Sequence, residues 1–411
     1  MEEWKEYKLG DVCDFQEGYV NPPQGNPEYF DGDIKWLRAT DLNDGFVYST
    51  TRTLTHLGFK SARKSAILFK PGTIAISKSG TIGRLGILQD YMCGNRAVIN
   101  IIPHHTVNTY FVFCVLRSYQ RYFPSMAVGS VQKNLYISIL EDLKINLPDL
   151  ETQKRIVSVL KSLDDKIEVN RRINDNLEQQ AQALFKSWFV DFEPFKDDEF
   201  VESELGMIPK GWRVGTIDDI CCFESGFAFK SATYKQEGEY KLITIKNVQD
   251  GYLDVNGLVS INEVPGKLPQ YCFLNIGDIL LSLTGNVGRC CFVDEENLLL
   301  NQRVAKLKPR VGSNWGYIYT LFRNCAFKER VISIARGTAQ ANLSPVETSK
   351  LKIIVPSENT LEKFSQIING YYHIMIINMI ESRRLASLRD TLLPKLMSGE
   401  LKVFDKPNDQ S

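Results

Sequence analysis

Two long segments of the chain follow a heptad pattern, in which apolar residues recur at alternating steps of four and three. In the first segment these positions are Ile156, Leu160, Leu163, Ile167, Asn170, Asn174, Leu177, Ala181, Leu184 and Trp188. The same positions 208 residues later are Phe364, Ile368, Tyr371, Met375, Asn378, Ser382, Leu385, Arg389, Leu392 and Leu396. Such spacing predicts coiled-coil helices, although Arg389 interrupts the second seam and Pro394 should kink its last turn. The alternative is two unrelated amphipathic helices, each covering its own domain.

Polar residues interrupt both seams at the same depth. Asn170 and Asn174 do so in the first segment, Asn378 and Ser382 in the second. A buried asparagine at a seam position fixes the register of paired helices at some cost in stability, so we expect Asn170, Asn174 and Asn378 to set the register. If the helices pair, the chain returns antiparallel along the second one. At about 1.5 Å per residue the roughly 35-residue helices would span roughly 50 Å, with one domain at each end.

Outside these helices, short stretches rich in Ile, Val and Phe alternate with Gly and Pro turns, which predicts mixed sheets with a few helices. The second half repeats the first in order. The matching pairs are 36–45 with 242–251, 79–84 with 284–289, 95–103 with 301–309, and 129–135 with 337–343. We therefore predict a tandem duplication: an α+β chain with two copies of one mixed α/β domain, separated by two long antiparallel coiled-coil helices in a pseudo-two-fold arrangement.

This duplication predicts the domain boundaries. They are a first domain at 1–149, a first helix at 150–190, an acidic linker at 191–209, a second domain at 210–356, a second helix at 357–398 and a C-terminal tail at 399–411.

Composition limits the class of protein. The 411 residues are 43% hydrophobic and 24% charged, which is typical of packed domains and excludes a disordered or fibrous chain. No apolar run approaches the roughly 18 residues of a membrane span, so a cytoplasmic protein without membrane contact is expected. The nine cysteines include no Cys-x-x-Cys spacing and only four histidines are present, which favours neither a disulfide framework nor a metal site.

The formal net charge is zero, but the charges are unevenly placed. Eleven bases and one acid, Asp90, lie between Asp44 and Glu141, a net charge of +10. Eight bases and one acid lie between Glu296 and Glu347, a net charge of +7. We call these stretches the first and second basic segments. Two basic surfaces on a neutral chain fit a polyanion bound at two places. The alternative is that the charges are scattered over solvated faces.

Motifs for catalysis are missing or incomplete. Asn21-Pro22-Pro23-Gln24 resembles the tetrapeptide with which amino-methyltransferases hold a base, but glutamine replaces the stacking aromatic residue. Asp33-Ile34-Lys35 matches one limb of a metal-dependent nuclease, without a matching second acid. Neither a phosphate-binding Gly-x-x-x-x-Gly-Lys loop nor a Gly-x-Ser-x-Gly turn occurs. We expect no catalytic residue, cofactor or metal.

Two repeated turns are the best candidates for contacts to nucleic acid. Each has two glycines three residues apart and then an arginine, Arg84 or Arg289, that could approach a phosphate or a guanine edge. The alternative is that the glycines serve packing and the arginine forms an internal ion pair. Gln132 and Gln340 could bridge an adenine, or could cap their loops. The predicted DNA-binding residues are Arg63, Lys64, Lys78, Ser79, Thr81, Arg84, Gln132, Lys133, Thr284, Asn286, Arg289, Arg336 and Gln340.

The segments that close the two helices, Leu184–Phe192 and Leu392–Leu401, together with the paired turns and the duplication, resemble the specificity subunits of type I restriction-modification systems. The resemblance covers essentially the whole chain. It implies two target-recognition domains, each reading one half of a split sequence in double-stranded DNA. It also implies helices that fix the gap and dock two methylation subunits, with motor-nuclease subunits joining for cleavage. S-adenosylmethionine, ATP and magnesium would belong to these partners.

Two other functions stay open at this point. One is a self-sufficient DNA-modifying enzyme, which incubation of the pure chain with DNA and S-adenosylmethionine or magnesium would reveal. The other is a protein-interaction scaffold that does not bind DNA, which a DNA competition assay would identify.

Overall fold

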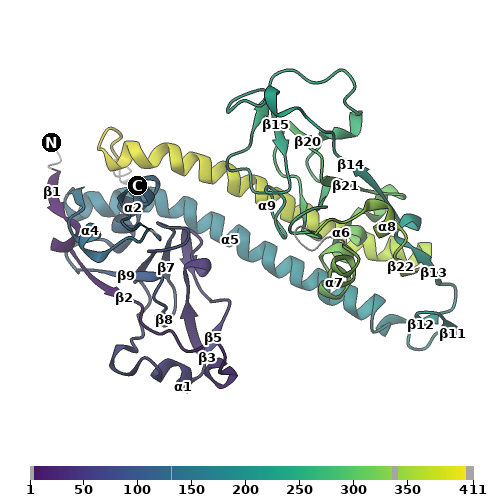
Figure 1. Ribbon diagram of the computed structural model, residues 1–411, viewed down its shortest axis with the longest axis horizontal. Coiled ribbons are helices and arrows are strands. Elements are labelled where there is room, and N and C mark those ends of the chain that lie inside the picture. The colour runs from purple at the N-terminus through teal and green to yellow at the C-terminus, as the bar shows by residue number, and fades with distance from the viewer. Residues whose placement is uncertain (1–3, 131, 336–340, 404–411) are drawn as a thin grey trace, which may run out of the picture. The chain divides into compact units, whose positions relative to one another are not determined.

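The computed structural model describes residues 4–130, 132–335 and 341–403 (Figure 1). The chain divides into two compact units. The first unit comprises residues 1–169 and 383–411, and the second comprises residues 170–382. Each unit therefore contains one predicted domain together with part of each long helix.

The first unit contains a five-stranded sheet in the order β2-β9-β6-β7-β4 and a three-stranded sheet in the order β5-β3-β8. The larger sheet has β2 (Cys13–Glu17), β9 (Val98–Pro103), β6 (Ile74–Ser77), β7 (Leu85–Leu88) and β4 (Gly45–Val47). The smaller has β5 (Thr53–Leu54), β3 (Phe30–Leu37) and β8 (Met92–Gly94), while β1 (Lys5–Lys8) pairs with β10 (Lys144–Leu147). The helices are α1 (His56–Lys60), α2 (Thr109–Tyr119), α3 (Phe123–Met126) and α4 (Ile137–Glu141). The apolar α2 packs into the core of this unit through side chains such as Phe111 and Phe113.

The second unit has two four-stranded sheets, in the orders β14-β21-β18-β19 and β16-β15-β20-β17. The first consists of β14 (Cys221–Ser225), β21 (Val304–Pro309), β18 (Ile279–Ser282) and β19 (Cys290–Phe292). The second consists of β16 (Ser260–Ile261), β15 (Tyr240–Ile243), β20 (Leu298–Leu300) and β17 (Phe273–Leu274). Two further pairs are β13 (Arg213–Thr216) with β22 (Lys352–Val355), and β11 (Phe200–Ser203) with β12 (Gly206–Pro209) in the acidic stretch. The helices are α6 (Trp315–Arg323), α7 (Cys325–Ser333) and α8 (Pro345–Ser349).

The predicted duplication is confirmed by equivalent strand pairs in the two units. The antiparallel pair β2–β9 corresponds to β14–β21, and β6–β9 corresponds to β18–β21. β3 pairs with β8 in parallel, as β15 does with β20. The order of strands and helices along the chain is therefore repeated, as expected for two copies of one α+β domain.

The two predicted long helices are present as α5 (Leu150–Phe189) and α9 (Glu358–Met397). In the first unit, Ile156 and Leu160 of α5 share a core with Leu393 and Leu396 of α9. In the second unit, Ala181 and Phe185 of α5 share a core with Phe364 and Ile368 of α9. Within each unit the start of one helix therefore packs near the end of the other, which is the antiparallel pairing that the heptads predict. Pro394 lies inside α9 and does not end it.

Arg389, which interrupts the predicted seam, belongs to a buried ion-pair network in the first unit. Its guanidinium lies 2.7 Å from a carboxylate oxygen of Asp164 on α5, and the guanidinium of Arg117 on α2 lies 2.6 Å from the other oxygen. Burial raises the pKa of Asp164, but the charges of Arg117 and Arg389 outweigh it and hold the pKa below its usual value. The network ties α2 to both long helices.

The seam asparagines pair with one another in the second unit. The side-chain amide of Asn378 donates to the side-chain oxygen of Asn174 at 2.8 Å, and that of Asn174 donates to the carbonyl of Met375 at 3.1 Å. Asn170 is fully buried, and its amide donates to the carboxylate of Glu381 at 2.7 Å. All three lie between α5 and α9, which is the position that a role in helix register requires.

In the part of the chain that the structure describes, no helix is both long enough and apolar enough to cross a membrane.

Candidate nucleic-acid interface

Four chain segments meet beside the larger sheet of the first unit, and we call them the first turn cluster. They are residues 18–20, 78–84, 95–97 and 128–134, of which 131 is not described. Backbone hydrogen bonds hold them together: the Lys78 N–H donates to the Ala97 carbonyl at 2.8 Å, and the Leu135 N–H donates to the Lys78 carbonyl at 2.9 Å. The Gly18 N–H donates to the Val98 carbonyl at 3.0 Å. Because these bonds fix the backbones, the side chains project from defined positions.

The second unit builds an equivalent second turn cluster from residues 226–227, 283–289, 301–303 and 341–342. The bonds repeat those of the first cluster. The Leu283 N–H donates to the Arg303 carbonyl at 2.9 Å, the Leu343 N–H to the Leu283 carbonyl at 2.7 Å, and the Gly226 N–H to the Val304 carbonyl at 3.0 Å. The same turn architecture is thus present twice, with different side chains.

Both clusters depend on a glycine at the end of β2 or β14. A Cβ atom on Gly18 would lie 2.3 Å from the Asn95 carbonyl oxygen, and one on Gly226 would lie 2.1 Å from the Asn301 carbonyl oxygen. Such contacts are impossible without moving the backbone, so only glycine allows the two turns to approach each other here.

The structure brings most of the predicted contact residues of the first unit together. Thr81, Arg84, Gln132 and Lys133 are exposed in the first turn cluster, and Ser79 is half-buried beside them. Lys78 is half-buried in an ion pair with Glu17, with an N–O distance of 2.7 Å.

Arg63 and Lys64 lie outside the first turn cluster, in a short helical turn at Arg63–Ser65 that follows α1, where both are exposed. The sequence prediction did not include two exposed residues of the cluster, Arg96 and Tyr19. In the sequence, each of these residues directly follows a glycine or an asparagine near the end of a strand. That arrangement is too common to identify a contact residue when the fold is unknown.

In the second unit the prediction for Thr284 needs correction. Its side chain is buried, with 1% exposure, and its hydroxyl donates to the side-chain oxygen of Asn342 at 2.9 Å. Thr284 therefore holds the turn together instead of facing a ligand. Asn286 is exposed as predicted, whereas Arg289 is half-buried and donates to the side chain of Gln249. Arg336 and Gln340 lie outside the described residues.

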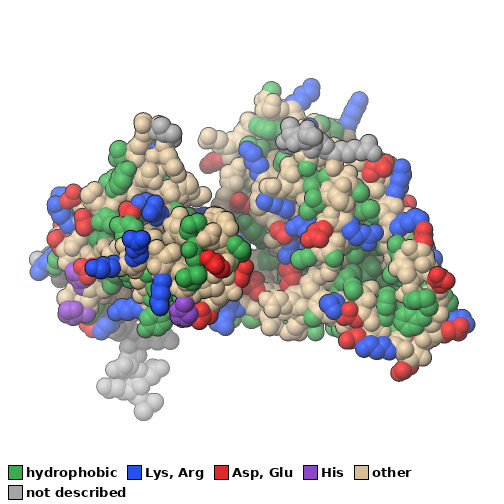
Figure 2. Space-filling model, turned by 60° about the horizontal axis from the view of Figure 1, so that its bottom comes forward, with side chains coloured by type: hydrophobic (Ala, Val, Ile, Leu, Met, Phe, Trp, Pro, Cys, Tyr) green, Lys and Arg blue, Asp and Glu red, His purple; other side chains and the backbone are tan. Residues whose placement is uncertain are grey.

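The first basic segment leaves most of its cations free on the surface. Two of its bases form ion pairs, Lys78 with Glu17 and Arg117 with Asp164. Among the described residues, seven exposed bases of this segment have side chains with no hydrogen-bond or ion-pair partner: Lys60, Arg63, Lys64, Lys70, Arg84, Arg96 and Lys133. Figure 2 shows Lys and Arg side chains gathered on the forward face of this unit. The segment is therefore a surface able to bind a polyanion.

The second basic segment is largely neutralised inside its own unit. Lys306 lies 3.0 Å from Asp278, Arg310 lies 2.6 Å from Asp218, and Lys328 lies 2.7 Å from Asp250. Arg323 contacts both Glu178 and Asp250, and Lys308 contacts Glu224. Burial alone would raise the pKa of Asp250. The hydrogen bond from Lys328 and the charge of Arg323 outweigh the effect of burial and hold the pKa below its usual value. The expected second basic surface is thus replaced by ion pairs, because acids distant in sequence face these bases.

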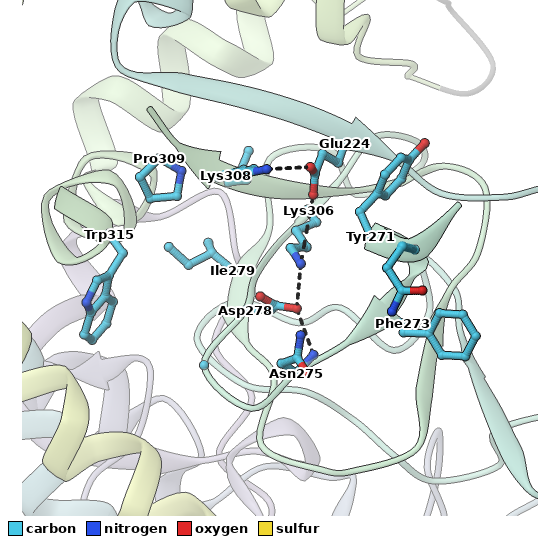
Figure 3. A pocket seen from close by; sticks show the side chains of 13 residues that line it. Glu224, Tyr271, Phe273, Asn275, Asp278, Ile279, Lys306, Lys308, Pro309 and Trp315 are labelled. Carbon is cyan, nitrogen blue, oxygen red and sulfur yellow. Dashed lines mark hydrogen bonds and ion pairs between the residues drawn. The ribbon is translucent and has the colours of Figure 1, made fainter. Parts of the chain in front are cut away.

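Lys306 and Lys308 line a cavity of about 660 Å³ in the second unit (Figure 3). The carboxylate of Glu224 lies 3.5 Å from the ammonium nitrogen of Lys308 and 3.9 Å from that of Lys306. Lys306 also forms an ion pair with Asp278. The backbone N–H of Asn275 donates to Asp278 at 2.8 Å. The two carboxylates balance the two ammonium groups, so the charged wall of the cavity has no excess charge for a phosphate.

The residues of the incomplete catalytic motifs are engaged in ordinary structural contacts. Lys35 forms an ion pair with Asp90 at 2.5 Å, and Gln24 accepts a hydrogen bond from Arg52 at 2.6 Å. Within the described ranges, no group of three or more His, Cys, Asp or Glu side chains is arranged to hold a metal ion.

Comparison with known proteins agrees with this arrangement. Residues 1–179 and 209–382 match the family model described as type I restriction modification DNA specificity domain. The MjaIX specificity subunit of a type I restriction enzyme from Methanocaldococcus jannaschii is 30% identical, over 98% of this chain and 94% of the relative. The HindI specificity subunit from Haemophilus influenzae is 25% identical, over 98% of this chain and all of the relative.

A crystal structure of a type I restriction-modification S subunit from M. genitalium has the same fold, with a TM-score of 0.51 and 17% identity over 99% of this chain and 97% of that one. The family model matches two regions of the chain, and these regions contain the two turn clusters. The chain belongs to the family of type I restriction-modification DNA specificity subunits.

Proposed function

We propose that this chain is the non-catalytic subunit that gives a type I restriction-modification complex its DNA sequence specificity, and that each turn cluster reads one half of a split site. The observation that carries the proposal is the presence of two equivalent clusters, each placed at the same end of its sheet. In this proposal the recognition domains are residues 1–149 and 210–356.

The proposed contacts divide into two kinds. Arg63, Lys64, Arg84, Arg96 and Lys133 are exposed cations suited to phosphate oxygens, which position a protein on DNA. Thr81, Gln132 and Asn286 are exposed neutral side chains suited to base edges. Lys78, Ser79 and Arg289 are half-buried, and we assign them a supporting role at the edge of these contacts.

The chemistry belongs to the partners of the complex. Two methylation subunits dock on the paired helices, and motor-nuclease subunits join for cleavage. S-adenosylmethionine, ATP and magnesium are bound by those subunits, and the complex acts on DNA in the cytoplasm. The competing functions, a self-sufficient DNA-modifying enzyme or a scaffold that does not bind DNA, have no support from the family match or from the described side chains.

An exchange of one recognition domain tests the proposal. Residues 1–149 are replaced by the corresponding domain of another family member, and the methylated sites are sequenced in a strain carrying the complete system. We expect one half of the recognised sequence to change while the other half stays the same. The matched exchange of residues 210–356 should change only the other half. A change of both halves in either exchange would refute the division between the domains.

A further inference from the structure

Arg303 has an unusual backbone conformation. It occupies the turn that enters β21, and its φ angle is 71°. Residues other than glycine rarely adopt this left-handed region, because the Cβ atom crowds the following carbonyl. The conformation is held by neighbours: the Arg303 carbonyl accepts the Leu283 N–H, and Val304 begins the strand. Glycine or asparagine would fill this position with less strain.

The side chain of Arg303 makes no contact that would stabilise the described part of the fold. It is exposed, and no acid or hydrogen-bond acceptor among the described residues contacts it. Five other bases of the second basic segment, by contrast, are paired with acids: Lys306, Lys308, Arg310, Arg323 and Lys328. An arginine that has a strained backbone and no partner inside the protein is typical of a residue that contacts a ligand.

The surroundings of Arg303 point to the kind of partner. It lies in the second turn cluster, between the exposed Gln302 and the turn that carries Asn286. The equivalent position in the first cluster is Ala97, and the neighbouring Arg96 corresponds to Gln302. Each cluster therefore has one free arginine at this turn, displaced by one residue, so the two domains present the guanidinium differently.

We propose that Arg303 is a specificity-determining residue of the second domain, whose guanidinium reads a guanine edge in the half-site bound there. The inference rests on the proposed function and deepens it. A phosphate contact requires only a positive charge within reach, which a flexible lysine on an unstrained backbone supplies. A bidentate contact to a guanine requires a planar group aimed from a fixed backbone, and this is what the strained turn provides.

The test uses the complex of the chain with its methylation subunits. After the recognised sequence is determined, binding is measured for the native duplex and for duplexes with each base pair of the two half-sites replaced. The variants are Arg303→Gly, which relieves the backbone, and Arg303→Lys, which keeps the charge. The matched control is Lys308→Gln, which removes an exposed cation that is already paired with Glu224.

We expect both Arg303 variants to bind the native duplex about tenfold more weakly or worse, and to lose discrimination at one base pair of the second half-site only. The control should bind as the wild type does. The thermal unfolding midpoint of Arg303→Gly should be equal to or higher than that of the wild type, because the strain is removed without loss of a contact.

Three results would overturn the inference. Binding of Arg303→Gly equal to the wild type would show that the side chain contacts no DNA. Weakening by the same factor on every duplex, with Arg303→Lys unaffected, would assign Arg303 to a phosphate. A lowered unfolding midpoint would assign the side chain a structural role. A wild-type complex without any sequence preference would instead refute the proposed function.

Discussion

The two units share one fold but distribute charge in opposite ways. In the first unit, the basic segment has seven exposed cations around the first turn cluster and α1. Their side chains form no ion pair or hydrogen bond with the described residues. In the second, acids from other strands and from α5 face the bases, as Glu224 and Asp278 face Lys306. The two basic segments of the sequence therefore produce a polyanion-binding surface in one copy and mainly internal ion pairs in the other. We infer that the first domain supplies most of the electrostatic affinity for DNA and that the second relies on a few directed contacts.

The two units also differ in the polar contact at the helix seam. The first unit uses a buried charge, Asp164, between Arg117 and Arg389. The second uses hydrogen bonds between asparagine side chains of α5 and α9. Breaking a buried ion pair leaves an uncompensated charge, whereas breaking a neutral hydrogen bond leaves only an unsatisfied polar group. The two seams should therefore respond very differently to substitution.

Replacing Asp164 should have the largest effect on stability. In Asp164→Asn, Arg117 loses its carboxylate partner, and Arg389 keeps only the exposed Asp390. The side chains of these two arginines are only 6% and 16% exposed. We expect the free energy of unfolding to fall by about 3–5 kcal/mol, the range measured when one partner of a buried ion pair is removed. Denaturant-induced unfolding of the purified chain, followed by circular dichroism, measures this loss.

The matched variant in the second unit is Glu178→Gln. Arg323 keeps its second partner there, because one of its guanidinium nitrogens lies 2.5 Å from a carboxylate oxygen of Asp250. The loss should be smaller, about 1–2 kcal/mol. Equal losses in the two variants would mean that the buried network around Asp164 has no special role in the first unit.

Neutralising the free cations of the first turn cluster should have the next largest effect. The triple variant Arg84→Gln, Arg96→Gln and Lys133→Gln removes up to three phosphate contacts. The slope of log K against log salt should become shallower by up to about 2.7, because each phosphate contact contributes about 0.9. Fluorescence anisotropy with the complete methylation complex, over a series of salt concentrations, measures the slope.

The control for this comparison is Lys308→Gln, Arg310→Gln and Lys328→Gln in the second unit. These three bases are already paired with acids, so the salt slope should stay close to that of the wild type. If the control lowers the slope as much as the first triple variant does, the second unit binds phosphates through ion pairs that open on DNA, and the proposed asymmetry is wrong.

The sequence predicted the architecture because the signals for it are local or repeated. The heptad spacing from Ile156 to Trp188 and its copy 208 residues later depend only on helical periodicity, and the ordered matches depend only on duplication. The turn clusters were partly predictable, since Arg84 and Gln132 lie in repeated turns. Three features could not be read from the sequence: the burial of Thr284, the neutralisation of Lys306 and the left-handed turn at Arg303. Each depends on strands that are distant along the chain and meet only in the folded sheet.

The smallest expected effect concerns the asparagine pair of the second seam. A double-mutant cycle with Asn174→Ala and Asn378→Ala should give a coupling free energy of about 0.5–1.5 kcal/mol, because the two side chains share a hydrogen bond of 2.8 Å. The control cycle pairs Asn378→Ala with Asn176→Ala, an exposed residue of α5 whose side chain accepts a hydrogen bond from Gln180 on the same helix. Its coupling should be close to zero. If the two cycles give the same value, the contact between Asn174 and Asn378 does not specify how α5 and α9 pair, and register in this unit depends on the apolar seam residues, such as Trp188 and Phe364.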